Sequence, residues 1–174
     1  SMVLLKNADQ ILPLKTSEKV AFVGGFAKKP RFQGGGSSHI NCFKITNALE
    51  SVPADAQVTY VEGFSADKDL YDEKLAAEAV QAAKAADKVV IFAGLPDSFE
   101  SEGYDRSHMR LPECQNRLIA EILEVQPNTV IVLHNGSPVE MPWINNVKGI
   151  LEAYLGGQAG GAAVANILYG IVNP

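Results

Sequence analysis

Short apolar runs alternate with amphipathic stretches along almost the whole chain. Each run consists mostly of Val, Ile, Leu, Phe or Ala, which is typical of strands that are covered on both faces. The runs that predict strands are residues 20–25, 57–61, 88–93, 129–134 and 149–154. A further apolar run at residues 2–5 stands at the beginning of the sequence, with nothing before it.

Helical periodicity appears between these runs. Apolar residues share one face across 73–87 and again across 112–125, where Pro112 suits the first helical turn. Val164, Ile167 and Leu168 repeat the spacing near the C-terminus. A shorter helix is expected over residues 46–51.

Alternation of strand and helix predicts parallel strands joined by helical crossovers. We therefore expect one domain over residues 1–174, folded as an α/β protein: a three-layer α/β/α sandwich with a mostly parallel sheet of five or six strands. The length of 174 residues excludes a complete (β/α)8 barrel, which needs about 250.

The connections after the predicted strands are the expected sites of function, since open α/β sheets bind ligands beyond the carboxyl ends of their strands. Two of them, residues 25–39 and 94–111, are much longer than the usual two to six or so. They also have the most unusual composition. We expect these two loops to carry the chemistry.

Composition and charge narrow the possible partners. The chain is 47% hydrophobic and 20% charged, with a net charge of −5 and no basic run beyond Lys28-Lys29. This argues against a nucleic-acid or an anionic-membrane partner. No stretch is apolar enough to span a membrane and no secretory signal is visible, so a cytoplasmic location is expected.

Cofactor and metal motifs are missing from the sequence. Cys42 and Cys114 lie far apart, which excludes a zinc ribbon or a disulfide framework and favours two free thiols. His39, His108 and His134 lack metal-binding spacing, and His134, at the end of an apolar run, is expected to pack in the core. The glycines at 34–36 are not followed by the lysine of a P-loop. We expect no metal and no cofactor.

The second long loop is acidic and has two interpretations. It carries Asp97, Glu100, Glu102 and Asp105 together with Arg106. Such a cluster can supply a proton donor whose pKa is set by burial and by neighbouring charges. The alternative is a solvated acidic loop with a surface pair between Asp105 and Arg106.

Five segments in this order resemble the α/β-sandwich domain of glycoside hydrolase family 3, the β-glucosidase and β-xylosidase type. They are VLLKN with LPL near the N-terminus, GGGSS at 34–38, ESEGYDR at 100–106 with LP at 111–112, HNGSPV at 134–139, and YLGGQAGG at 154–161. The resemblance covers essentially the whole chain, and the ESEGYDR segment is its most specific part.

The resemblance implies a retaining β-glycosidase that removes single β-linked sugars, with a β-linked glucoside or oligosaccharide as substrate. In that family the nucleophilic Asp lies on a preceding (β/α)8 barrel and the acid/base Glu on this domain. The acid/base position carries over to Glu102, with Glu100 as its competitor. Because the chain holds no barrel, we expect a longer parent protein whose barrel is the partner of this domain, and no activity of this chain alone.

The remaining site residues are assigned by inference from the loop. Asp105 and Arg106 are expected to orient it, while Phe99 or Tyr104 borders the aglycone site. Two other classes of function stay open at this point: a free-standing sugar- or nucleotide-binding module, and a structural domain whose acidic loop docks a partner.

Overall fold

The computed structural model of the chain describes residues 2–103 and 105–174. Its sheet has six strands. The strands are β1 (Val3–Asn7), β2 (Lys19–Val23), β3 (Gln57–Val61), β4 (Lys88–Gly94), β5 (Thr129–His134) and β6 (Gly149–Glu152). The helices are α1 (Glu73–Ala85), α2 (Glu113–Val125) and α3 (Gly160–Leu168), with short 3-10 turns at Ala8–Gln10, Gly25–Ala27, Gly36–Ser38 and Leu49–Ser51.

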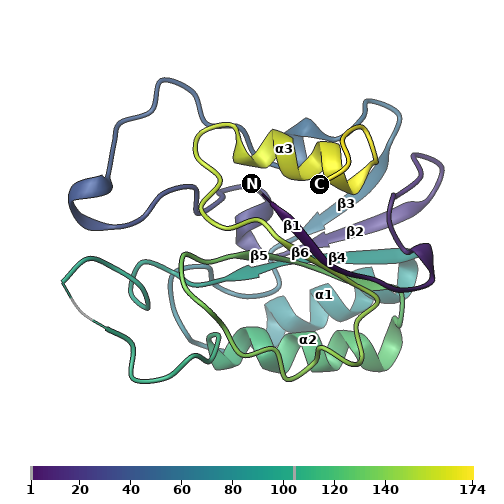
Figure 1. Cartoon of the computed structure of the whole chain (residues 1–174). Helices are drawn as coiled ribbons and strands as arrows, with labels where there is room; N and C mark the ends of the chain where they lie inside the picture. The colour runs from purple at the N-terminus through teal and green to yellow at the C-terminus, as the bar shows by residue number, and fades with distance from the viewer. Residues whose placement is uncertain (1, 104) are drawn as a thin grey trace.

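The strands lie in the order β1-β6-β5-β4-β2-β3. Strands β2 to β6 are parallel, and β1 is antiparallel to β6 at one edge. Helices α1 and α2 cover one face of the sheet, while α3 and the turn at Leu49–Ser51 cover the other (Figure 1). The predicted three-layer α/β/α sandwich with a mostly parallel sheet is confirmed.

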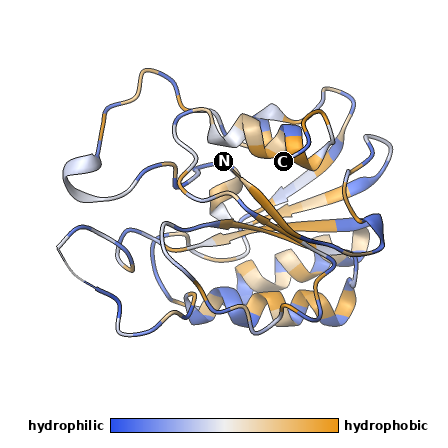
Figure 2. Cartoon of the chain, viewed as in Figure 1, coloured by the Kyte–Doolittle hydropathy of each residue, from blue (hydrophilic) through white to orange (hydrophobic). Residues whose placement is uncertain are grey.

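Burial of both faces explains why the strands appear as continuous apolar runs. In β4, Val89, Ile91 and Ala93 face the core cluster under α1 and α2, whereas Val90 and Phe92 face the cluster under α3. All six residues of β5 are buried as well. The central strands are accordingly hydrophobic along their length, whereas α1 and α2 mix hydrophobic and hydrophilic residues (Figure 2).

Helix α1 shows how local chemistry sets the limits of an element. The side chain of Asp72 accepts hydrogen bonds from Lys74 N and Leu75 N, at 2.9 and 3.1 Å, and so caps the helix. The helix ends at Ala85 and not at the predicted Asp87. Asp87 instead exchanges two hydrogen bonds with the backbone of Lys19, both 2.8 Å, and thereby joins the start of β2.

The helix predicted over residues 46–51 is wrong, since only Leu49–Ser51 forms a single 3-10 turn. The residues before this turn bond elsewhere. Thr46 N donates to Gln158 O, Thr46 Oγ1 accepts from Ala162 N, and Asn47 Oδ1 accepts from Glu50 N. These bonds fasten the segment to the N-terminus of α3 and leave it no helix of its own.

The apolar run at residues 2–5 belongs to β1, which the sequence alone did not assign. The strand pairs along one side only, and its side chains alternate between exposed and half-buried. Such an edge strand carries a weaker apolar signal than a central one.

The two cysteines differ in their surroundings, and this gives a testable difference in reactivity. Burial, with the Asp69 carboxylate beside it, raises the pKa of the Cys114 thiol to about 12, while Cys42 is half-exposed. Since the thiolate is the reactive form, we expect Ellman's reagent to label one thiol quickly in the folded chain and the second only after unfolding. Cys42→Ser should remove the fast phase. Fast labelling of Cys114 in that variant would contradict the described packing.

Candidate functional site

The two long loops project beyond the same edge of the sheet, where the parallel strands have their carboxyl ends (Figure 1). The first follows β2 and spans residues 24–48; we call it the glycine-rich loop. The second follows β4 and spans residues 95–111; we call it the acidic loop. A shorter turn at 135–142 follows β5 and lies beside the acidic loop. Parallel pairing of the strands therefore gathers segments that are distant in sequence.

The side chain of Gln115 fixes the point at which the acidic loop leaves the sheet. It is fully buried on α2 and exchanges two hydrogen bonds with Gly94: Nε2 donates to the carbonyl at 2.9 Å, and Gly94 N donates to Oε1 at 3.0 Å. Gly94 has a φ of +154°, and a side chain there would collide with the His134 carbonyl. The next residue is held too, since Leu95 N donates to that carbonyl at 3.0 Å.

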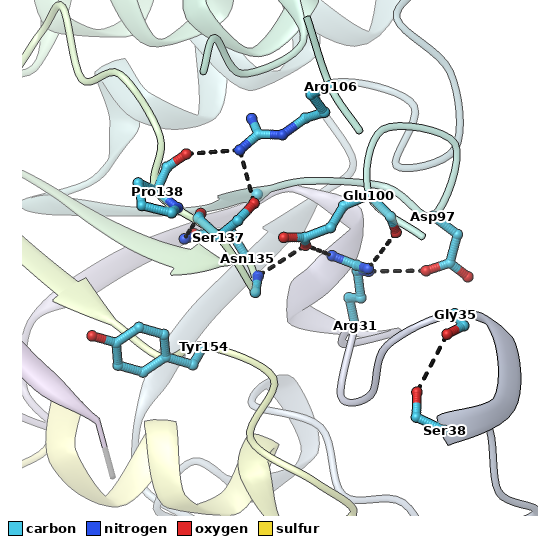
Figure 3. Close-up of polar contacts among 12 residues, drawn as sticks. Arg31, Gly35, Ser38, Asp97, Glu100, Arg106, Asn135, Ser137, Pro138 and Tyr154 are labelled. Atoms are coloured by element: carbon cyan, nitrogen blue, oxygen red, sulfur yellow. Dashed lines mark hydrogen bonds and ion pairs between the residues drawn. The ribbon is translucent and has the colours of Figure 1, made fainter. Parts of the chain in front are cut away.

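Arg31 joins the glycine-rich loop to the acidic loop. Its side chain is only 5% exposed. Nε donates to Asp97 Oδ1 at 2.9 Å, Nη2 donates to the backbone carbonyl of Glu100 at 2.8 Å, and Nη1 binds the Glu100 carboxylate (Figure 3). One guanidinium thus holds the first part of the acidic loop by two carboxylates and a carbonyl.

Glu100 is a fixed carboxylate. Its side chain is 18% exposed, and Gly136 N donates to Oε2 at 2.8 Å. Burial raises the pKa of Glu100, but hydrogen bonds from Ser137, Arg31 and Gly136 outweigh this, so that its pKa is lowered overall. The contacts of Glu100 therefore favour its ionised form.

Arg106 anchors the other side of the same loop segment. Its Nη2 donates to Ser137 Oγ at 2.8 Å and to the Pro138 carbonyl at 2.7 Å (Figure 3). The suggested surface pair between Asp105 and Arg106 is wrong, because the guanidinium turns toward the 136–138 turn instead. Asp105 itself is exposed.

Glu102 lies between these two anchors and is exposed. Its Oε2 accepts hydrogen bonds from Ser37 N at 2.5 Å and from Ser37 Oγ at 2.7 Å. These two bonds from the glycine-rich loop lower the pKa of Glu102. Gly36 has a φ of +79°, and a side chain there would overlap the Glu102 carboxylate, so the glycine permits this close approach.

The predicted aromatic residues are placed differently from each other. Phe99 is half-buried against the core under α1 and α2, with its ring 6.5 Å from the His108 ring. The structure thus gives Phe99 a packing contact, and its place beside the aglycone stays a prediction. Tyr104 lies outside the described residues.

Sequence reasoning missed Arg31, Gln115 and Ser137 as residues that shape the site. Gln115 leaves a weak signal, since it is a polar residue on the apolar face of a predicted helix. Ser137 stands in the HNGSPV segment, but that segment was given no role of its own. Arg31 has no periodic or motif signal, because its partners are 66 and 69 residues away.

His134 packs between aromatic rings, as predicted, 5.7 Å from the ring of Phe26 and 6.3 Å from that of Phe92. Burial lowers its pKa to about 4, so it is neutral, and Nε2 has no hydrogen-bond partner among residues 2–103 and 105–174. Within those residues, no three His, Cys, Asp or Glu side chains gather in a way that could hold a metal ion. None of the described helices is long and apolar enough to cross a membrane.

The lowered pKa of Glu100 predicts how stability changes with pH. Relative to the ordinary value of 4.5, its stabilising contribution is fully present above that pH and is lost as the pH falls through the lower, folded-state pKa. We expect the free energy of unfolding of the wild type to fall more steeply with acid than that of Glu100→Gln, in urea titrations from about pH 7 to 3. Glu78→Gln, on the exposed side of α1, is the matched control. Equal slopes for wild type and Glu100→Gln would refute the fixed, ionised state.

Comparison with known proteins identifies the family of this domain. The model of the glycosyl hydrolase family 3 C-terminal domain matches residues 2–174. Thermostable beta-glucosidase B of Acetivibrio thermocellus is 55% identical over 178 residues, and an exo-alpha-(1->6)-L-arabinopyranosidase of Bifidobacterium longum is 43% identical over 185; each alignment covers all of this chain and 24% of the relative.

A solved structure gives the same result at the level of the fold. The crystal structure of a Bifidobacterium adolescentis GH3 beta-glucosidase superposes with a TM-score of 0.93 at 47% identity, over 98% of this chain and 25% of that one. The chain spans about a quarter of the length of these relatives. It belongs to glycosyl hydrolase family 3 and is a C-terminal domain of that family.

Proposed function

We propose that this domain supplies Glu102 as the general acid and base of a retaining β-glycosidase whose nucleophile lies on a barrel domain outside this chain. The observation that carries the proposal is the contrast between two carboxylates of one loop. Glu100 is tied to Arg31 and to the 136–138 turn, whereas Glu102 is exposed and, among the described residues, hydrogen-bonded through Ser37. A carboxyl group that protonates a substrate must be reachable and free to change its charge.

Retaining hydrolysis assigns Glu102 two steps. In the first, its carboxyl proton passes to the glycosidic oxygen as the bond from that oxygen to the anomeric carbon breaks and the nucleophilic carboxylate bonds to the same carbon. In the second, the Glu102 carboxylate takes a proton from water as the water oxygen displaces the nucleophile. The free sugar leaves and the proton is again on Glu102.

The acid step requires a protonated Glu102, while the two bonds from Ser37 lower its pKa. A barrel packed over the loop changes this balance in two ways. It buries the carboxyl group, and it brings the negative nucleophile to about 5–5.5 Å, and both effects raise a carboxyl pKa. We therefore expect Glu102 to exchange Ser37 for the glycosidic oxygen when substrate is bound.

We propose a β-linked glucose as the sugar that is released. The support is the 55% identity to a relative named a beta-glucosidase, together with the likeness to a structure of the same name. The Bifidobacterium longum relative is named for an arabinopyranoside, so close relatives of this domain serve more than one sugar. This favours a barrel that selects the sugar and a domain that supplies the acid.

One prediction concerns this chain in the absence of a barrel domain. On this proposal the chain holds the acid/base carboxyl group of the catalytic pair but not the nucleophile. Without the nucleophile, no glycosyl-enzyme intermediate can form. We expect the purified 174-residue chain to release no p-nitrophenol from p-nitrophenyl β-glucoside above the buffer rate. Turnover that disappears in Glu102→Gln would contradict the division of the catalytic pair between two domains.

A second prediction tests Glu102 in the full-length enzyme that contains this domain. Glu102→Ala should lower kcat/KM on cellobiose or an alkyl β-glucoside by about 10²- to 10⁴-fold, the usual contribution of a general acid. Substrates with an acidic phenol need little protonation and should lose far less in the first step. Azide needs no deprotonation, so it should restore turnover and yield the β-glucosyl azide.

The matched control is Glu100→Ala, because the two residues lie on the same loop and carry the same group. It should lower activity through loss of the Arg31 contact, but azide should not restore it, since Glu102 is still present. Azide rescue of Glu100→Ala and not of Glu102→Ala would assign the acid/base to Glu100.

A further inference from the structure

The turn that follows β5 contacts the acidic loop at two points. On one side, Gly136 N donates to the Glu100 carboxylate at 2.8 Å, next to Ser137 in the chain. On the other side, Ser137 Oγ accepts from Arg106 Nη2 at 2.8 Å, and the Pro138 carbonyl accepts from the same atom at 2.7 Å. Three consecutive residues thus bind both ends of the segment 100–106 (Figure 3).

Between these two ends, Ser37 binds the Glu102 carboxylate, and this contact is given up when Glu102 turns to the substrate as proposed above. Glu102, Gly103 and Asp105 are exposed. Gly103 has a φ of +94° and no atom within 4 Å of where a side chain would begin. A glycine in open space adds backbone freedom, so the direction of Glu102 depends on how firmly the two ends are held.

The turn itself is braced from β6. Asn135 is buried, and its Nδ2 donates to the Ser137 carbonyl at 3.0 Å and to Glu152 Oε2 at 3.2 Å. Glu152 Oε1 in turn accepts from Tyr154 N at 3.1 Å. The 136–138 turn is therefore fixed to the end of the sheet and can serve as a rigid support for the loop.

Ser137 is the residue of this support that no backbone group can replace. Its hydroxyl accepts from the Arg106 guanidinium, while the adjacent Gly136 N donates to Glu100. Nη1 of Arg106 is already buried without a hydrogen-bond partner in the described part of the chain. Among the described residues, losing the serine hydroxyl would leave this guanidinium the Pro138 carbonyl as its acceptor, which weakens its hold on the loop.

We propose that Ser137 is a positioning residue for the acid/base carboxyl group: it binds Arg106 while the adjacent Gly136 binds Glu100, and so holds the segment between them with Glu102 directed at the glycosidic oxygen. The inference rests on the proposed role of Glu102. Ser137 does not touch the substrate. Its effect on the reaction passes through the placement of the proton donor.

The test uses the full-length enzyme and compares leaving groups. A misplaced acid should slow the step that needs a proton, so Ser137→Ala should lower kcat/KM for an alkyl β-glucoside by about 10- to 100-fold. For 2,4-dinitrophenyl β-glucoside, whose phenol leaves without protonation, the loss should stay within about twofold. Ser137→Thr keeps the hydroxyl and should restore most of the activity on the alkyl substrate.

Two controls separate positioning from general damage. Ser107→Ala removes an exposed serine beside Arg106 and should leave both substrates unaffected. In a double-mutant cycle, Arg106→Gln alone should lower alkyl-glucoside activity. The double variant Arg106→Gln/Ser137→Ala should lose much less activity than the product of the two single fold-losses, because both substitutions remove the same contact. The cycle also applies if Ser137→Ala alone is too unstable to study, with Ser137→Gly as the replacement.

The outcomes distinguish this inference from the proposed function. An equal loss on both leaving groups, or fully independent losses in the cycle, would overturn the role of Ser137 while Glu102→Ala still behaves as an acid/base variant. Failure of azide to rescue Glu102→Ala would overturn the proposed function first, and the positioning role with it.

Discussion

The buried guanidinium of Arg31 is the interaction on which the arrangement of the site depends. A charge that is only 5% exposed is costly unless it is paired and hydrogen-bonded, and here it has Asp97 and Glu100 as its partners. In the described parts of the two loops, no strand and no helix of eight or more residues holds their shape. The ion pairs therefore do what regular structure does elsewhere: they fix the glycine-rich loop and the acidic loop relative to each other.

This constraint divides the two glutamates of one short segment between different tasks. Glu100 is held in place because its carboxylate binds both Arg31 and the 136–138 turn. Glu102, two residues further on, stays exposed and accepts hydrogen bonds from Ser37. Enzymes commonly place two neighbouring carboxyl groups in different environments, so that one stays a fixed charge while the other exchanges protons.

The sequence predicts the architecture well because burial leaves a direct trace in it. Strands β2, β4, β5 and β6 appear as apolar runs because nearly all their residues are buried, whereas the edge strand β3 is only half-buried. Helices α1 and α2 appear at the expected spacing. The edge strand β1 has a weaker apolar pattern because it is partly exposed. The segment before the turn at Leu49–Ser51 is hard to predict because it bonds to the residues around the start of α3. The site shows the same dependence. The composition of the acidic loop marks it in the sequence, whereas nothing marks Arg31, because its partner Asp97 is 66 residues away and meets it only in the folded chain.

The most direct test of the account is a crystal structure of the full-length enzyme with an uncleaved, non-hydrolysable β-glucoside analogue. We expect the Glu102 carboxyl group within hydrogen-bond distance of the glycosidic oxygen or its substitute, about 5–5.5 Å from the nucleophilic carboxylate, and Glu100 still bound to Arg31. A structure in which Glu102 stays on Ser37 while Glu100 leaves Arg31 and reaches that oxygen would contradict it.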